Sequence, residues 1–147
     1  MVVVVWIFAL LTAAIHIVVF ACEALLLDRP AIHRGFFGVP SEDVPAVRLW
    51  AFGVGFYNLF LGCGLVIGVV AWWMGQVVVG RTLVTYLCWL LFLAGIVLFI
   101  ADRLGFSRER GKGVGGAIGQ STPPFIALVA LLFTWSLAQW NLLGWHF

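Results

Sequence analysis

The sequence predicts an all-α integral membrane protein, a bundle of four transmembrane helices with little chain outside the bilayer. Its 147 residues are 64% hydrophobic and only 10% charged, which is far from the composition of soluble domains. Four apolar blocks, roughly residues 2–27, 46–74, 81–101 and 123–145, reach the about 20 residues that cross the hydrocarbon layer. Strands of a membrane β-barrel would instead alternate polar and apolar residues. We therefore expect one domain, residues 1–147.

Charge and cysteine content argue against several classes of function. The formal net charge of +2 is too small to favour nucleic acid as a partner. Cys22, Cys63 and Cys88 fall singly in three different apolar blocks. This spacing predicts neither a metal site nor a disulfide framework, and nothing else in the sequence implies a cofactor. We expect the three thiols to be small packing residues.

The basic residues predict which side of the membrane each loop faces. Arg and Lys accumulate in the cytoplasmic loops of membrane proteins. Apart from Arg81, all of them lie in or beside the first and third loops: Arg29, Arg34, Arg48, Arg103, Arg108, Arg110 and Lys112. We therefore expect both loops in the cytoplasm and both termini on the non-cytoplasmic side. The chain is predicted to be a multi-pass protein of a bacterial cell (plasma) membrane, with the lipid bilayer as its main partner.

The two basic loops differ in composition. Asp28–Pro45 mixes apolar and basic residues and is expected to lie on the membrane surface. Ser107–Gln120 is rich in glycine and basic residues, so we expect a mobile loop that packs no core. Pro123 and Pro124 then fit the first turn of the last helix, where an N–H group would have no partner.

Two ionisable side chains lie within the first apolar block. His16 and Glu23 are seven residues apart, so they share one helix face at about 10 Å along the axis. An ionisable group at membrane depth costs roughly 2.5 to 3.5 kcal/mol and normally turns towards the bundle interior. Asn58 in the second block lies at a depth between the two. The three side chains are candidates for an intramembrane polar site, with Tyr57 beside them.

Glycines in the second block predict close helix packing. Gly55 and Gly62 flank Asn58 on one stripe, and Gly64 and Gly68 form a GxxxG spacing on a neighbouring stripe. Small residues at such spacings allow another helix backbone to approach closely.

Each polar residue also has a structural interpretation. In this interpretation, the carboxyl group of Glu23 would be hydrogen-bonded by water or by an arginine near the headgroups. His16 and Asn58 would hydrogen-bond neighbouring helices, and Tyr57 would be a core aromatic. Asp102 and Arg103, at the inner end of the third helix, read best as a solvated terminus. The sequence alone leaves these interpretations open beside the polar site.

Three segments carry a resemblance to a known family. HIVVFACE from His16 to Glu23, GFYNLFLGCG from Gly55 to Gly64, and GQSTPPFIALV at the start of the last helix resemble an uncharacterised family of small four-helix bacterial membrane proteins, the domain of unknown function thirteen-oh-four. The resemblance implies a four-helix bundle whose recurring polar positions match His16, Glu23, Tyr57 and Asn58. This chain departs from the family pattern at Val54 and Gly55, where an Asn-Gln pair is typical. The family has no established activity.

Three classes of function remain. The favoured one is a binding or transport module in which His16, Glu23 and Asn58 line a cavity for a small or lipophilic solute. A second is a structural or accessory subunit that forms a homo-oligomer or joins a larger membrane complex. A third is a membrane enzyme acting on a lipid, quinone or isoprenoid. It is disfavoured because His16 and Glu23 are too far apart to act on one atom and the sequence contains no nucleophile motif.

Overall fold

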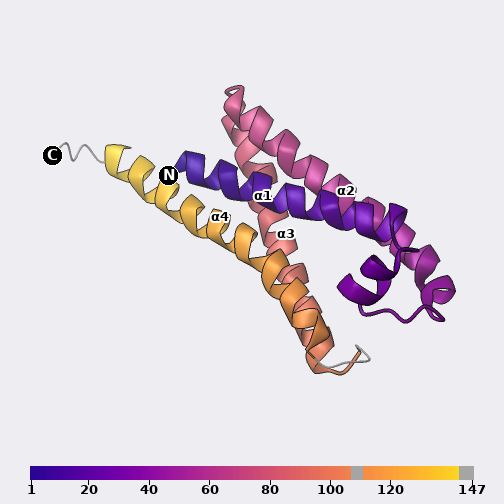
Figure 1. Cartoon of the computed structure of the whole chain (residues 1–147). Coiled ribbons are helices and arrows are strands. Elements are labelled where there is room, and N and C mark those ends of the chain that lie inside the picture. Colours follow the sequence, from indigo (N-terminus) through magenta and orange to yellow (C-terminus); the bar gives the residue numbers. More distant parts are fainter. Residues whose placement is uncertain (107–110, 143–147) are drawn as a thin grey trace.

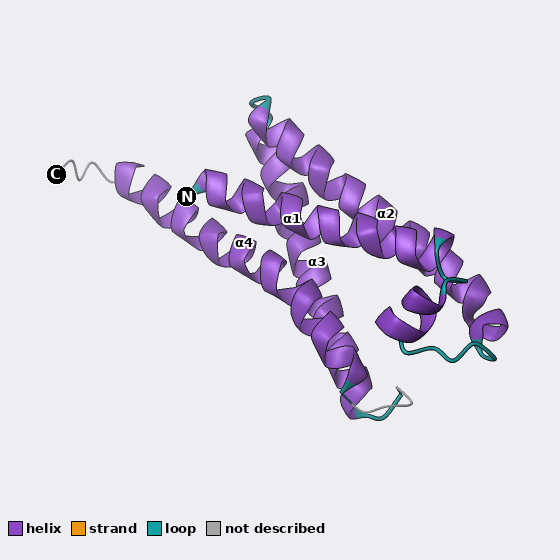
Figure 2. Ribbon diagram, in the orientation of Figure 1, coloured by secondary structure: helices purple, strands orange, loops and turns teal. Residues whose placement is uncertain are grey.

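All regular secondary structure is helical in the residues that the computed structural model describes, which are 1–106 and 111–142, with the backbone alone for residues 135–142 (Figure 2). In chain order the elements are the helix α1, the single-turn π-helices η1 and η2, and the helices α2, α3 and α4. Their bounds are Val2–Phe20, Ala21–Leu25, Ala31–Phe36, Val44–Trp73, Val77–Arg103 and Lys112–Leu142.

Four helical segments in the described part of the chain are long and apolar enough to cross a membrane. They confirm the predicted all-α architecture with four transmembrane helices. α1 continues directly into η1, so the first span extends from Val2 to Leu25. α2 and α3 are joined by a tight turn at Gly75, whose φ of +88° is a conformation that favours glycine.

Each long helix packs against two others, in the order α1–α2–α3–α4 and back to α1. The shared core lies near one end of the bundle, because antiparallel neighbours place the first half of α1 and α3 beside the second half of α2 and α4. Beyond this core, the α1–α2 pair and the α3–α4 pair diverge towards their connecting loops (Figure 1). The core consists of Val5, Ala9, Ala13, Leu65, Val69, Trp72, Val84, Leu87, Cys88, Leu91, Ala127, Leu128, Ala130 and Leu131.

The glycines of α2 lie where it meets both of its neighbours. A Cβ atom on Gly62 would be 3.0 Å from the carbonyl oxygen of Ala13, so this glycine lets α1 approach. A Cβ atom on Gly68 would be 3.1 Å from the Cβ of Leu83 on α3. Gly55 faces η1 and Gly64 faces α3 in the same way. The two stripes therefore pack against helices of this chain.

Asp102 is buried, which corrects its interpretation as part of a solvated terminus. Its side chain is 1% exposed and accepts hydrogen bonds from the backbone N–H groups of Gly111 and Gly113 at 2.9 Å. The first N–H groups of a helix have no partner within that helix. Asp102 therefore caps the start of α4 from the end of α3.

α4 begins at Lys112, eleven residues before the predicted start at position 123. Residues 112–120 are helical, so for this part the predicted mobile loop is wrong; residues 107–110 lie outside the described part. Pro123 and Pro124 are inside the helix and buried. Proline is tolerated there because packed neighbours in a membrane bundle accommodate the interrupted backbone. Gly113 allows one close contact, because a Cβ atom at this position would be 3.2 Å from the side chain of Asp102.

The first loop folds back on itself and approaches α4. It contains η2, and the buried His33 ring bonds the carbonyl oxygen of Val39 through Nδ1 at 2.8 Å. A Cβ atom on Gly38 would lie 3.1 Å from the side chain of Lys112. This loop therefore lies near the region where the two helix pairs diverge (Figure 1).

Candidate functional site

A hydrogen bond between two polar side chains joins α1 and α2 at membrane depth. Asn58 Nδ2 donates to Glu23 Oε2 at 2.9 Å, and both residues are partly buried. An arginine was the predicted alternative partner of Glu23. Arg48 does not take this role, because it pairs with Asp28 at 2.9 Å on the surface. The structure thus brings together two of the predicted site residues, which we call the Glu23–Asn58 pair.

The local backbone around Glu23 is unusual. Glu23 lies within η1, the π-helical turn Ala21–Leu25. Single π-turns are rare in membrane and soluble helices, and they occur frequently at functional sites because they re-aim side chains. The sequence carries no pattern that would have predicted this turn.

Gly55 gives α2 the close approach that the pair requires. A Cβ atom at this position would lie 3.1 Å from the Cβ of Ala24 and 3.3 Å from the Cβ of Glu23. The rings of Phe20 and Phe56 meet edge to face with centroids 5.1 Å apart, so aromatic packing fixes the same two helices. Backbone and aromatic contacts therefore hold Glu23 within reach of Asn58.

His16 is buried separately from the pair. Its side chain is 2% exposed, and Nδ1 lies 2.8 Å from the carbonyl oxygen of Thr12. A carbonyl oxygen only accepts, so Nδ1 donates and the neutral ring keeps Nε2 as an acceptor. Thr12 in turn donates to the carbonyl oxygen of Phe8 at 2.7 Å. These hydrogen bonds remain within α1, and none of them connects His16 to Glu23 or Asn58.

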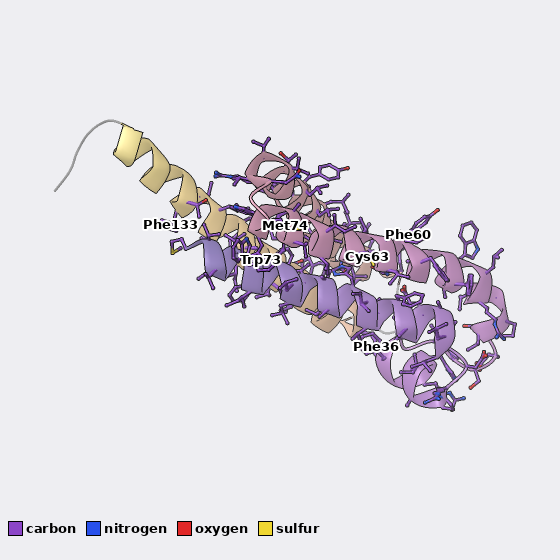
Figure 3. All side chains as sticks on the ribbon, turned by 90° about the horizontal axis from the view of Figure 1, so that it is seen from above. Phe36, Phe60, Cys63, Trp73, Met74 and Phe133 are labelled. Atoms are coloured by element: carbon purple, nitrogen blue, oxygen red, sulfur yellow. The ribbon has the colours of Figure 1, made fainter. Side chains whose placement is uncertain are left out.

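Tyr57 points away from the pair. It is 67% exposed, whereas its neighbour Asn58 is partly buried, because adjacent residues on a helix face different directions. Phe60, which is 61% exposed and labelled in Figure 3, lies on the same outer surface of α2. Tyr57 is therefore next to Asn58 in the sequence but does not lie with the polar site in space.

A groove between α3 and α4 was not among the features predicted from the sequence. Gly95 faces Ser121 there, and the groove has a volume of about 250 Å³. A signal was present, since Gly95 on α3 and the small residues Ala117 and Ser121 on α4 occur at helix-packing spacings. It was overlooked because the segment before position 120 was assigned to a loop.

In the described part of the chain, no group of three or more His, Cys, Asp or Glu side chains is placed to hold a metal ion. Cys22 and Cys88 are buried and Cys63 is exposed, all as free thiols. The candidate site is therefore the Glu23–Asn58 pair itself.

The fold and this intramembrane pair define a multi-pass membrane protein built as a four-helix bundle. The chain belongs to a family described as a protein of unknown function (DUF1304), whose model matches residues 10–132 and thus includes both Glu23 and Asn58. This match confirms the family indicated by the sequence motifs. No curated protein and no solved structure matches the chain.

Proposed function

We propose that the protein binds a lipophilic small molecule whose polar end carries a hydrogen-bond donor, such as an amine or a hydroxyl. The observation that supports this most strongly is a carboxyl group held on a π-helical turn inside an apolar span. A polar side chain at that depth is costly and is usually retained for a function.

The hydrogen bond within the pair determines which ligand group would fit. Asn58 uses an N–H of its amide to donate to Glu23 Oε2. The amide oxygen of Asn58 is an acceptor, and so is the second carboxyl oxygen of Glu23 when this group is ionised. The site therefore presents acceptors, and a ligand with a donor complements it better than a ligand with a carboxylate.

The position of the pair favours access from the membrane. Glu23 lies in η1, beyond the shared core, where the two helix pairs diverge (Figure 1). The apolar part of a ligand would lie among lipid-facing side chains such as Phe20 and Phe56, which are partly buried. A molecule dissolved in the bilayer would reach the pair without crossing water.

The test uses photoreactive dodecyl probes that end in an amine, a hydroxyl or a carboxylate, applied to the full chain in nanodiscs. We expect the amine and hydroxyl probes to label peptides around Glu23 and Asn58, and the carboxylate probe to label them weakly. Asn58→Leu should reduce both signals, and Glu23→Gln should reduce the amine signal most. Glu42→Gln, in the first loop, is the matched control. Equal labelling by all three probes, unchanged by either substitution, would contradict the proposal.

A second candidate, a structural or accessory subunit, is favoured by Tyr57. Tyr57 lies nine residues beyond Arg48, which is about 13.5 Å along the axis of α2. It is 67% exposed, at a depth where lipid provides no hydrogen-bond partner. A second protein surface would provide one.

Cys63 allows a direct test of this candidate, because it is exposed on α2 whereas Cys22 and Cys88 are buried. If copies of the chain meet through the face of α2 that carries Cys63, mild oxidation in native membranes should give a disulfide-linked dimer. Cys63→Ser should abolish the dimer. A wild-type chain that stays monomeric under oxidation, and that purifies without a stoichiometric partner, would argue against this candidate.

A further inference from the structure

The groove between α3 and α4 lies on the membrane-facing surface, away from the Glu23–Asn58 pair. It is lined by Gly95, Ile96, Phe99, Ala117, Ile118, Ser121 and Thr122. Side chains at its rim are open to the surroundings: Phe99 is 43% exposed and Ile118 is 61% exposed. A membrane component can therefore enter the groove sideways.

Close helix packing shapes the groove. A Cβ atom on Gly95 would collide with the hydroxyl oxygen of Ser121 and lie 3.2 Å from the carbonyl oxygen of Ala117. The two backbones meet at these small residues, while Phe99 and Ile118 form the walls on either side. The volume of about 250 Å³ is below the roughly 300 Å³ of the smallest typical drug sites. It suits a segment of a flexible hydrocarbon chain.

A cation lies at the end of the groove nearest the third loop. The guanidinium carbon of Arg103 is 5.1 Å from the ring centroid of Phe99, one helical turn along the same face of α3. The Arg103 side chain is 53% exposed. One of its nitrogens lies 3.4 Å from Asp102, whose carboxylate also accepts two backbone N–H groups of the α4 start. With five N–H donors, Arg103 has further donors for a phosphate.

From this arrangement we infer that the α3–α4 groove binds an anionic phospholipid, with an acyl chain along the groove and the phosphate at Arg103. The sequence after Arg103 also supports an anionic headgroup, because it is basic and contains Arg108, Arg110 and Lys112. Anionic lipids attract such basic segments at the cytoplasmic surface, which is the side predicted for this loop. The inference is independent of the proposed ligand at Glu23 and Asn58.

The experiment is native mass spectrometry of the full chain released from nanodiscs that contain equal amounts of phosphatidylglycerol and phosphatidylcholine. The wild-type protein should retain phosphatidylglycerol in preference to phosphatidylcholine. Arg103→Gln should lower that preference about tenfold, the effect of losing one charge-assisted hydrogen bond to the phosphate, and Arg103→Lys should keep most of it. Arg34→Gln makes the same charge change in the exposed first loop, where only the general attraction to an anionic surface is lost, and should lower the preference by clearly less.

A second pair of variants tests the acyl-chain part of the site. Thr122→Phe fills the groove from an exposed position and should reduce retention of both lipids, whereas Val97→Phe places the same ring on an exposed surface outside the groove. Equal retention of the two lipids by the wild-type protein would overturn the inference. So would a loss of preference in Arg34→Gln as large as that in Arg103→Gln, or equal behaviour of Thr122→Phe and Val97→Phe.

Discussion

Breaking the hydrogen bond between Glu23 and Asn58 should weaken the bundle by an amount that a double-mutant cycle can measure. The donor and acceptor are 2.9 Å apart, at the preferred length of such bonds. Interhelical hydrogen bonds in membrane proteins average about 0.6 kcal/mol and reach about 1.7 kcal/mol. The packing at Gly55 holds both helices in place, so a side chain that loses its partner stays partly buried and unsatisfied. We therefore expect a coupling free energy of about 1 kcal/mol.

The cycle combines Glu23→Ala, Asn58→Ala and the double variant, each unfolded reversibly in mixed micelles of dodecyl maltoside and sodium dodecyl sulfate. Circular dichroism follows the loss of helix and yields the free energy of unfolding. A parallel cycle of Glu42→Ala with Asn58→Ala provides the baseline, because residues that share no contact should be additive within about 0.3–0.5 kcal/mol. A Glu23–Asn58 coupling within that range would refute the bond and with it the site built on it.

The same assay tests two other contacts. Gly62→Leu places a side chain against the backbone of α1 and should lower the free energy of unfolding by about 1–3 kcal/mol. Gly53 has nothing within 4 Å of its Cβ position, so Gly53→Leu should change the free energy of unfolding by no more than about 0.5 kcal/mol. Equal effects of the two variants would argue against the α1–α2 interface. Asp102→Ala removes the cap of α4 and should cost about 1–2 kcal/mol, more than Asp28→Ala, whose ion pair with Arg48 is on the surface. A smaller cost at Asp102 than at Asp28 would contradict the capping role.

The four spans were predictable because each is a long apolar block, and lipid leaves the backbone little choice but a helix. The start of α4 was not predictable, because glycine occurs both in flexible linkers and in packed helices. In water, Gly113 and its neighbours would indicate a flexible linker. In the structure, Gly113 lies against the side chain of Asp102, and the hydrogen bonds to this carboxylate cap the start of a helix there. That cap joins residues on two elements, so no local pattern reveals it.

The candidate site was predictable in its members more than in its geometry. Helical periodicity and depth placed Glu23 and Asn58 on facing surfaces of neighbouring helices, and the structure joins them. The same reasoning grouped His16 with them, but a buried imidazole can satisfy itself within its own helix, as the bond to Thr12 shows. Tyr57 illustrates a further limit. Adjacency in sequence indicates nothing about a shared site on a helix, where neighbours face different directions.

The two sites proposed for this protein lie on different helix pairs, and both lie away from the shared core. The α1–α2 pair carries the Glu23–Asn58 bond, and the α3–α4 pair carries the groove at Gly95 and the cap at Asp102. Core residues such as Val5 and Leu65 lie at the opposite end. Regions with few shared apolar contacts open at lower free energy than a packed core. Substitutions at either site are therefore expected to leave the contacts of the shared core in place.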